Sequence, residues 1–334
     1  MLNQSLKLNT KIFSNNIENK STRDGFGVGL LEIGTKNEKV VALSADLTES
    51  TRTHLFKEKF PNRFIQVGIS EQNMAGVASG LASMGKIPYI TSFAIFNPGR
   101  NWEQIRTTIC YNNQPVKIIG THSGITVGED GGSHQSLEDI ALTTSLPNMI
   151  VISPCDNIEA RKATIACANN NLPTYIRLDR NNTPFITTED TPFEIGKSQI
   201  LFYPEKGIAE IGIIATGTIV YRALIAAKNL EKEGIKVKVM NLSTIKPLDE
   251  EGVLSIAKET KAIVTVEDHG EIGGMGSMIA SFLSKNYPVP IEFIAIKNKF
   301  GQSGKKDELI EHYEIGISHI ENAVKKVKKR KILN

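Results

Sequence analysis

Short apolar runs alternate with helical patterns through most of this 334-residue chain, and this alternation constrains the fold more than any other feature. In the first half, apolar runs predict strands at 40–43, 64–67, 88–92, 116–120, 149–152 and 173–177. The segments between them predict helices at 71–84, 102–111, 138–144 and 157–168. Such alternation is typical of an α/β fold, a parallel sheet with helices on both faces.

The pattern lapses in the middle of the chain and then starts again, which predicts two domains. The stretch around Pro184, Pro192 and Pro204 indicates a linker. Further strands are predicted at 208–215, 236–241, 262–267 and 291–296, with helices at 219–233, 249–259, 276–286 and from 307 onward. We therefore expect a polar extension at 1–20, a first domain at 21–185, a linker at 186–205 and a second domain at 206–330.

Charge, cysteine count and hydropathy exclude several classes of protein. Lys and Arg number 39 and Asp and Glu 36, so the net charge of +3 does not indicate a nucleic-acid partner. The three cysteines lie far apart, which argues against a zinc motif or a disulfide framework. The N-terminus is polar and no apolar run is long enough to span a membrane. We expect a cytoplasmic protein that binds neither nucleic acid nor membrane.

Candidate functional residues follow the predicted strands of the first domain. In open α/β sheets, ligands bind at the carboxyl ends of the strands. Polar or aromatic side chains stand at this position after five strands, namely Asp46, Glu71, Phe93, His122 and Asp179 with Arg180. Polar loop residues are common in general, but their repeated occurrence at one edge favours a binding site there.

The run Gly68-Ile69-Ser70-Glu71-Gln72-Asn73-Met74 places a carboxylate where a strand ends and a helix begins. Alone, Glu71 could simply be a helix-start acid favoured by the helix dipole. Phe93 and Phe96 follow later, and alone they could be ordinary core residues. Together, an acid and a flat apolar surface suit a heteroaromatic ligand with a ring nitrogen.

Several motifs, in the same order along the chain, resemble the pyrimidine-binding domain of the transketolase family. The similar segments are residues 44–50, 68–82, 92–96, 121–124 and 128–135. The resemblance covers roughly residues 20 to 330 and implies a thiamine-diphosphate pyrimidine-binding fold followed by a transketolase C-terminal-like domain. It also implies transfer of a two-carbon ketol unit between sugar phosphates, as in pentose phosphate metabolism.

The resemblance gives roles to the residues around the cofactor. Glu71 aligns with the glutamate that bonds a pyrimidine nitrogen and so helps thiamine diphosphate lose the proton of its thiazolium carbon. Phe93 and Phe96 align with the aromatic pocket for the pyrimidine ring, and Asp46 with an aspartate near the cofactor. The family often has a tyrosine at the position of Gly99, where Arg100 or Trp102 are the candidates to fill the wall.

The resemblance also predicts a sugar-phosphate site. His134 aligns with a catalytic histidine that faces the reacting carbonyl and hydroxyl of the substrate, where an imidazole can move protons near neutral pH. The remaining residues expected to bind substrate are Arg23, Ser50, His122, Asp130 and Arg180. Arginine suits this role because its planar guanidinium can bind phosphate through two hydrogen bonds.

One expected motif is missing from the chain. The family binds the divalent metal of the diphosphate through a Gly-Asp-Gly motif, which does not occur here. The chain resembles only the second half of a full-length transketolase, so no metal ligand is predicted on it. We expect a separate N-terminal subunit to bind Mg²⁺ and the diphosphate, in a dimer of heterodimers. The Gly-rich segment 271–277 lacks the GxGxxG spacing and is interpreted as a strand-to-helix turn.

Other functions remain open from the sequence. The chain could be half of a 1-deoxyxylulose-5-phosphate synthase or of another carboligase that uses the same cofactor. The β subunit of a 2-oxoacid dehydrogenase shares the architecture but usually differs around the histidine loop. A noncatalytic scaffold subunit is a further alternative, which the joint presence of Glu71, His122, His134 and Arg180 disfavours.

Overall fold

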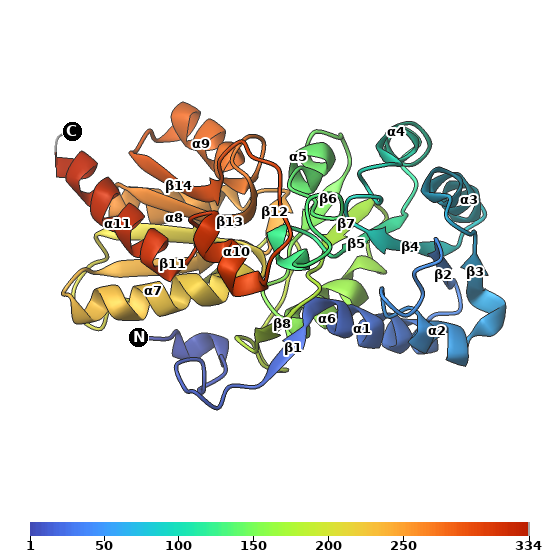
Figure 1. Ribbon diagram of the computed structural model, residues 1–334, viewed down its shortest axis with the longest axis horizontal. Coiled ribbons are helices and arrows are strands. Elements are labelled where there is room, and N and C mark those ends of the chain that lie inside the picture. Colours follow the sequence, from blue (N-terminus) through green and yellow to red (C-terminus); the bar gives the residue numbers. More distant parts are fainter. Residues whose placement is uncertain (333–334) are drawn as a thin grey trace.

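The structure, a computed structural model, describes residues 1–332 and contains two α/β domains that lie side by side (Figure 1). The sheet of the first domain has seven strands in the order β12-β6-β7-β5-β4-β2-β3. Their bounds are β2 (Val40–Ser44), β3 (Phe64–Gln66), β4 (Ile87–Phe93), β5 (Lys117–Thr121), β6 (Ile150–Ile152), β7 (Thr174–Arg177) and β12 (Thr244–Lys246). All neighbours are parallel except β12 and β6, so six strands end at the same edge.

The sheet of the second domain has five strands in the order β14-β13-β10-β11-β9. Their bounds are β9 (Gln199–Phe202), β10 (Ile211–Ala215), β11 (Val237–Asn241), β13 (Ile263–Gly270) and β14 (Ile291–Ile296). Only β9 is antiparallel to its neighbour. A separate pair, β1 (Asn19–Ser21) and β8 (Asn182–Pro184), is antiparallel and joins the N-terminal segment to the end of the first domain. The mostly parallel α/β architecture predicted from the sequence is confirmed.

Helices cover both faces of each sheet because successive strand residues point to opposite faces. In the first domain, α1 (Thr22–Lys36) and α6 (Asn157–Cys167) pack on the face that includes Val40 and Ala42. The opposite face, with Val41 and Leu43, carries α3 (Glu71–Ser83), α4 (Trp102–Gln104) and α5 (Asp139–Thr144). Helix α4 continues as a π-helical segment at Ile105–Cys110. The short helix α2 (His54–Lys59) contributes Phe56 to the first face.

In the second domain, α7 (Val220–Lys232) and α11 (Ile317–Ile332) pack on one face of the sheet. The helices α8 (Glu250–Thr260) and α9 (Met275–Asn286) pack on the other, and the apolar cluster there continues into the first domain. The short helix α10 (Lys306–His312) lies beside the first domain (Figure 1). Because one cluster of buried side chains spans both sheets, the two domains share part of their core.

Helix α1 is not predicted from the sequence because four glycines interrupt its pattern. The structure explains two of them by close packing against α6. A side chain on Gly25 would place its Cβ 2.0 Å from the Asn157 carbonyl oxygen, and one on Gly29 would place it 2.8 Å from that of Arg161. A weak helix signal therefore reflects a close helix–helix contact rather than a loop.

Three segments cross the expected domain boundaries. β9 forms within the predicted linker, and β12 of the second half adds to the sheet of the first domain. The N-terminal segment runs beneath α7, and Leu8 and Ile12 are buried in the core of the second domain (Figure 1). Among residues 1–332, the structure has no helix that combines the length and the apolar character needed to cross a membrane.

Candidate active site

Glu71 is the first residue of α3 and follows the loop that leaves β3. Its side chain is buried, and the residue is only 1% exposed. One carboxylate oxygen accepts a hydrogen bond from the Ser92 hydroxyl at 3.3 Å, and the other lies 3.4 Å from a guanidinium nitrogen of Arg100. Both distances lie at the long end of the range for hydrogen bonds. The carboxylate therefore keeps hydrogen-bonding capacity that a ligand could use.

Two aromatic rings and two imidazoles form a cluster at the ends of β4 and β5. Phe93 and Phe96 are stacked, with ring centroids 6.2 Å apart and an interplanar angle of 17°. His122 stacks on Phe93 at a centroid distance of 3.8 Å. The edge of His134 meets Phe96 at 5.6 Å. Four residues that the sequence predicted for cofactor and substrate are thus brought together, in contact with one another.

Of the two side chains expected near Gly99, Arg100 lies against Phe96 and Trp102 does not. The Arg100 guanidinium lies 4.8 Å from the centre of the Phe96 ring, whereas the Trp102 indole N–H donates to the Leu142 carbonyl. A Cβ on Gly99 would lie 2.0 Å from the Ile95 carbonyl oxygen, so no tyrosine fits this backbone. The side chain next to Gly99 that contacts the Phe96 ring is therefore a cation, which also pairs with Glu71.

A guanidinium group contacts His122. A guanidinium nitrogen of Arg23 lies 3.3 Å from His122 Nε2, and the Thr121 hydroxyl lies 3.0 Å from Nδ1. Because arginine can only donate, Nε2 must accept and the imidazole is neutral. Burial, followed by the charges of Arg23 and Arg180, lowers the pKa of His122 to about 3.

The remaining predicted residues differ in how closely they approach this cluster. Arg23 donates to the Ser50 carbonyl at 2.9 Å, so Ser50 lies beside it through its backbone. Arg180 donates to the Val127 carbonyl at 2.6 Å and lies 3.8 Å from the Asp130 carboxylate. Asp46 is exposed at the end of β2, and its backbone N–H donates to the Gln66 side chain at 2.8 Å.

The loop that carries His134 is held by the second domain. The Gln135 side chain is buried and donates to the Ile125 carbonyl at 3.1 Å and to the Gln302 carbonyl at 3.0 Å. Gly301 fits closely against it, since an added Cβ would lie 1.7 Å from Gln135 Oε1. Asp268 accepts from the Ile125 N–H at 3.1 Å. The position of His134 therefore depends on contacts between domains.

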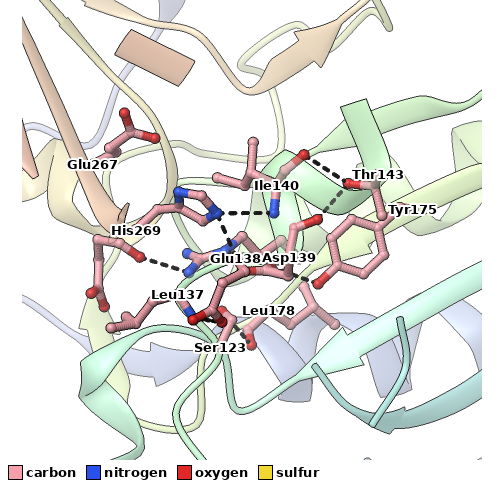
Figure 2. Close-up of polar contacts among 12 residues, drawn as sticks. Ser123, Leu137, Glu138, Asp139, Ile140, Thr143, Tyr175, Leu178, Glu267 and His269 are labelled. Atoms are coloured by element: carbon pink, nitrogen blue, oxygen red, sulfur yellow. Dashed lines mark hydrogen bonds and ion pairs between the residues drawn. The ribbon is translucent and has the colours of Figure 1, made fainter. Parts of the chain in front are cut away.

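A buried polar network lies at the same interface, and no sequence motif indicates it. Figure 2 shows the Asp139 carboxylate beside the Tyr175 hydroxyl, which donates to it at 2.7 Å. Arg177 donates to the same oxygen at 2.8 Å and to the Asp268 carbonyl at 2.6 Å. His269 accepts from the Ile140 N–H at 3.2 Å. Only the start of α5 at Asp139 could have signalled this network, because its other members come from distant segments.

The residues present fit one half of the predicted cofactor. A buried carboxylate with weak partners and a stacked aromatic pair suit an aminopyrimidine ring. Within residues 1–332, no three His, Cys, Asp or Glu side chains are grouped so that they could hold a metal ion. Glu71, Phe93 and Phe96 are therefore candidates to hold the pyrimidine, whereas no such set of side chains for a metal is found among the described residues.

Comparisons with known proteins agree with this geometry. Residues 18–185 match the transketolase pyrimidine-binding domain, and residues 205–320 match the transketolase C-terminal domain. The chain is 39% identical to the 6-deoxy-6-sulfo-D-fructose transketolase subunit SqwH of Clostridium sp. (strain MSTE9), over 96% of this chain and 98% of that protein. It is 34% identical to a subunit of the apulose-4-phosphate transketolase of Phocaeicola vulgatus, over 87% of this chain and 92% of that protein.

A solved structure of a split-gene transketolase, described as an inactive β4 tetramer, is similar along nearly its whole length. The identity is 41%, the TM-score is 0.86, and the match covers 93% of this chain and 99% of that one. These three proteins are named as subunits or as the product of a split gene, which agrees with a chain that carries the pyrimidine-binding and C-terminal domains together. The chain therefore belongs to the transketolase family and corresponds to the C-terminal subunit of a split transketolase.

Proposed function

We propose that this chain is the pyrimidine- and substrate-binding subunit of a transketolase that transfers a two-carbon ketol unit between sugar phosphates. The observation that carries the proposal is the buried Glu71 carboxylate, which contacts Ser92 and Arg100 next to the stacked Phe93 and Phe96 rings, with His122 and then Arg23 following Phe93. Such a reaction needs an acid near the cofactor and cations near the phosphate of the sugar, and this arrangement offers both. The proposed reaction belongs to pentose phosphate metabolism in the cytoplasm.

Glu71 would hold the pyrimidine in the tautomer that takes up a proton, and thiamine diphosphate would supply the nucleophilic carbon that cleaves the sugar. The Ser92 hydroxyl and Arg100 would orient the Glu71 carboxylate, since both lie next to it. Phe93 and Phe96 would exclude water from the ring. A proton-transfer group positioned in this way typically contributes about 10²- to 10⁴-fold to a rate.

Substrate would bind on the side of His122 and His134. Neutral His122 would hold Arg23 beside the phosphate, because its Nε2 accepts from that guanidinium, and once protonated it could itself bind a phosphate oxygen. Arg23 and Arg180 would bind the terminal phosphate, with Ser50 and Asp130 beside them. His134, in contact with Phe96, would move a proton at the reacting hydroxyl of the sugar. Asp46 would contribute from the end of β2 near the cofactor.

A separate partner subunit would bind Mg²⁺ and the diphosphate. Two relatives are named as transketolase subunits, and the solved relative is described as inactive in its β4 form. Both descriptions support a chain that is inactive until a second chain completes the cofactor site. We expect an assembly of two copies of each subunit.

The test is reconstitution. The purified chain alone, its copurified partner and the pair are each assayed for ketol transfer from a ketose phosphate to an aldose phosphate, with Mg²⁺ and thiamine diphosphate. Only the pair should be active. Robust ketol transfer by this chain alone would contradict the proposal, as would a pair that is inactive on every phosphorylated ketose.

The ketol-transfer assay should use a panel of donor sugars and not a single one, because the relatives are named for different substrates. They are named for a sulfonated ketose and for apulose 4-phosphate, so the family acts on more than one class of ketose. The panel also separates the runner-up, because a deoxyxylulose-phosphate synthase decarboxylates a 2-oxoacid instead of cleaving a ketose. Release of carbon dioxide from pyruvate without ketol transfer would support that alternative.

A further inference from the structure

Lys306, the first residue of α10 in the second domain, lies at the arginine side of the candidate active site. A hollow of about 530 Å³ is lined by Arg23, Glu129, Arg180, Asn181, Asn182 and Lys306. The first five of these belong to the first domain, and Lys306 reaches them from across the domain interface. The family resemblance predicts a phosphate site built from the first domain alone.

The lysine is held in place by the backbone of the first domain. Its Nζ donates to the Asn182 carbonyl at 3.0 Å, two residues after Arg180. An ammonium group has three N–H donors and this contact uses one of them, so the others are available for a ligand in the hollow. The contact holds the Lys306 ammonium group near the arginines. Because its partner is a neutral carbonyl, the contact does not neutralise the positive charge.

The hollow carries an excess of positive charge. Three cations line it against one carboxylate, that of Glu129, whose side chain is 72% exposed and lies 3.5 Å from Arg180, while Asp130 lies 3.8 Å from the same guanidinium. Burial, followed by the charge of Arg52, lowers the pKa of Arg23. Burial also lowers the pKa of Lys306, although Asp179 partly offsets this effect. Arg23 Nε is buried and has no hydrogen-bond partner among the described residues. An anion with several acceptor oxygens would compensate both the charge and the unused donor.

We propose that Lys306 is a substrate-binding residue of the second domain, which binds the terminal phosphate dianion of the sugar together with Arg23 and Arg180. The inference rests on the proposed function and extends it, because the phosphate site is then complete only when the two domains are docked. Three cations favour a dianionic terminus over a neutral hydroxymethyl group or a singly charged sulfonate. Lys306 thus contributes to selection among donor sugars.

The first test compares Lys306→Met with Lys305→Met in the reconstituted pair. Lys305 is the adjacent, exposed residue and serves as the matched control. Loss of one charge-assisted hydrogen bond should lower kcat/KM for a phosphorylated ketose by about tenfold or more. The same variant should leave kcat/KM for the corresponding unphosphorylated ketose within about twofold, as expected for a group that contacts only the phosphate. Lys306→Arg should restore most of the loss.

A second test needs no turnover and is made on the purified chain. Binding of inorganic phosphate is measured by calorimetry, with Lys305→Met again as the control. Lys306→Met should raise the Kd for phosphate by about tenfold, and the effect should shrink at high salt. If the pair shows no ketol transfer but phosphate binding still depends on Lys306, the proposed function fails and the anion site stands.

Two results would overturn the inference. One is an equal loss of kcat/KM on phosphorylated and unphosphorylated ketoses, which would mean that Lys306 only supports the fold through Asn182. The other is a phosphate Kd that depends on Arg180 but not on Lys306. In either case the second domain would contribute no ligand to the phosphate.

Discussion

The two parallel sheets of this molecule carry polar residues at their carboxyl ends, but they use them differently. At the edge of the first sheet, Glu71 and His122 have long or few contacts, and Arg23, which lies beside His122, lines a hollow. At the end of β13 in the second sheet, Glu267 accepts from the Met275 and Gly276 N–H groups at 2.7 and 2.8 Å, at the start of α9. Asp268 and His269 bind backbone of the first domain.

The difference shows that topology alone does not make a site. Both edges offer acids and a histidine, yet those of the second edge bind backbone groups and dock the domains, with only Asp268 Oδ2 lacking a partner among the described residues. Burial raises the pKa of Glu267 to about 7 and that of Asp268 to about 6. Perturbed groups therefore occur at both edges, and what distinguishes the first is the stacked aromatic cluster with an arginine beside it.

The largest expected difference between the two edges is in turnover. Glu71→Gln in the reconstituted pair should lower kcat by about 10²- to 10⁴-fold, because the amide cannot replace the acid in proton transfer. Glu267→Gln is the matched change at the other edge and should leave kcat within about threefold, since Glu267 contacts only the start of α9. Steady-state ketol transfer measures both. Equal losses in the two variants would mean that Glu71, too, is structural.

The next difference is in stability. Arg177→Met leaves Asp139 buried without its cation, and breaking such a pair typically costs about 3–5 kcal/mol. Arg222→Met removes an ion pair with exposed Asp307 and should cost about 1 kcal/mol or less. Urea unfolding of the two variants measures the free energies of unfolding. A loss of under about 1 kcal/mol for Arg177→Met would show that the interface network contributes little to docking.

A smaller effect concerns the pH dependence of stability. Burial, and then Arg177, lower the pKa of His269 to about 4 from 6.5, although Asp139 opposes this. A histidine with a lowered folded-state pKa contributes stability that is present above pH 6.5 and is lost as the pH falls through about 4. His269→Asn should therefore flatten the acid side of the stability profile by about 3 kcal/mol at most. Exposed His312→Asn is the control, and an unchanged profile for His269→Asn would contradict the assignment.

The smallest expected effect is a phosphate-induced change in histidine pKa, which should differ between the buried residues His122 and His269. Phosphate bound beside Arg23 and Arg180 should raise the pKa of His122 by about one unit, because an anion favours the imidazolium. The pKa of His269 should not move, since its neighbours are Asp139 and Arg177 across the interface. Titration of the histidine carbon-13 signals with and without phosphate measures both. A common shift of the two signals would indicate a general salt effect.

The sequence is sufficient for the regular parts of the fold and for the motif residues of the site. Strand and helix periodicity identifies most elements, and motif order predicts that Glu71, Phe93, His122 and His134 share one region, as they do. Their chemical roles are still predictions. Helix α1 escapes prediction because its glycines serve packing, and β9 and β12 because their pairing depends on distant strands.

Residues that depend on domain docking cannot be found in this way. Lys306, Asp139 and Arg177 carry no local motif, and each acquires its neighbours only when segments far apart in the chain meet. Arg100 is a candidate wall of the cofactor pocket from the sequence, but its pairing with Glu71 emerges only in three dimensions. The periodicity of the sequence does not reveal which side chains of a second domain complete a site in the first.

The three residues of β12 have a practical consequence for anyone who divides this chain. They come from the second half yet cover β6 at the edge of the first sheet. A fragment that ends in the predicted linker would lack β12, and the buried apolar strand Ile150–Ile152 would become an open edge. Open apolar edges pair with other copies and aggregate. The two halves are thus not separable modules, and expression trials should keep them on one polypeptide.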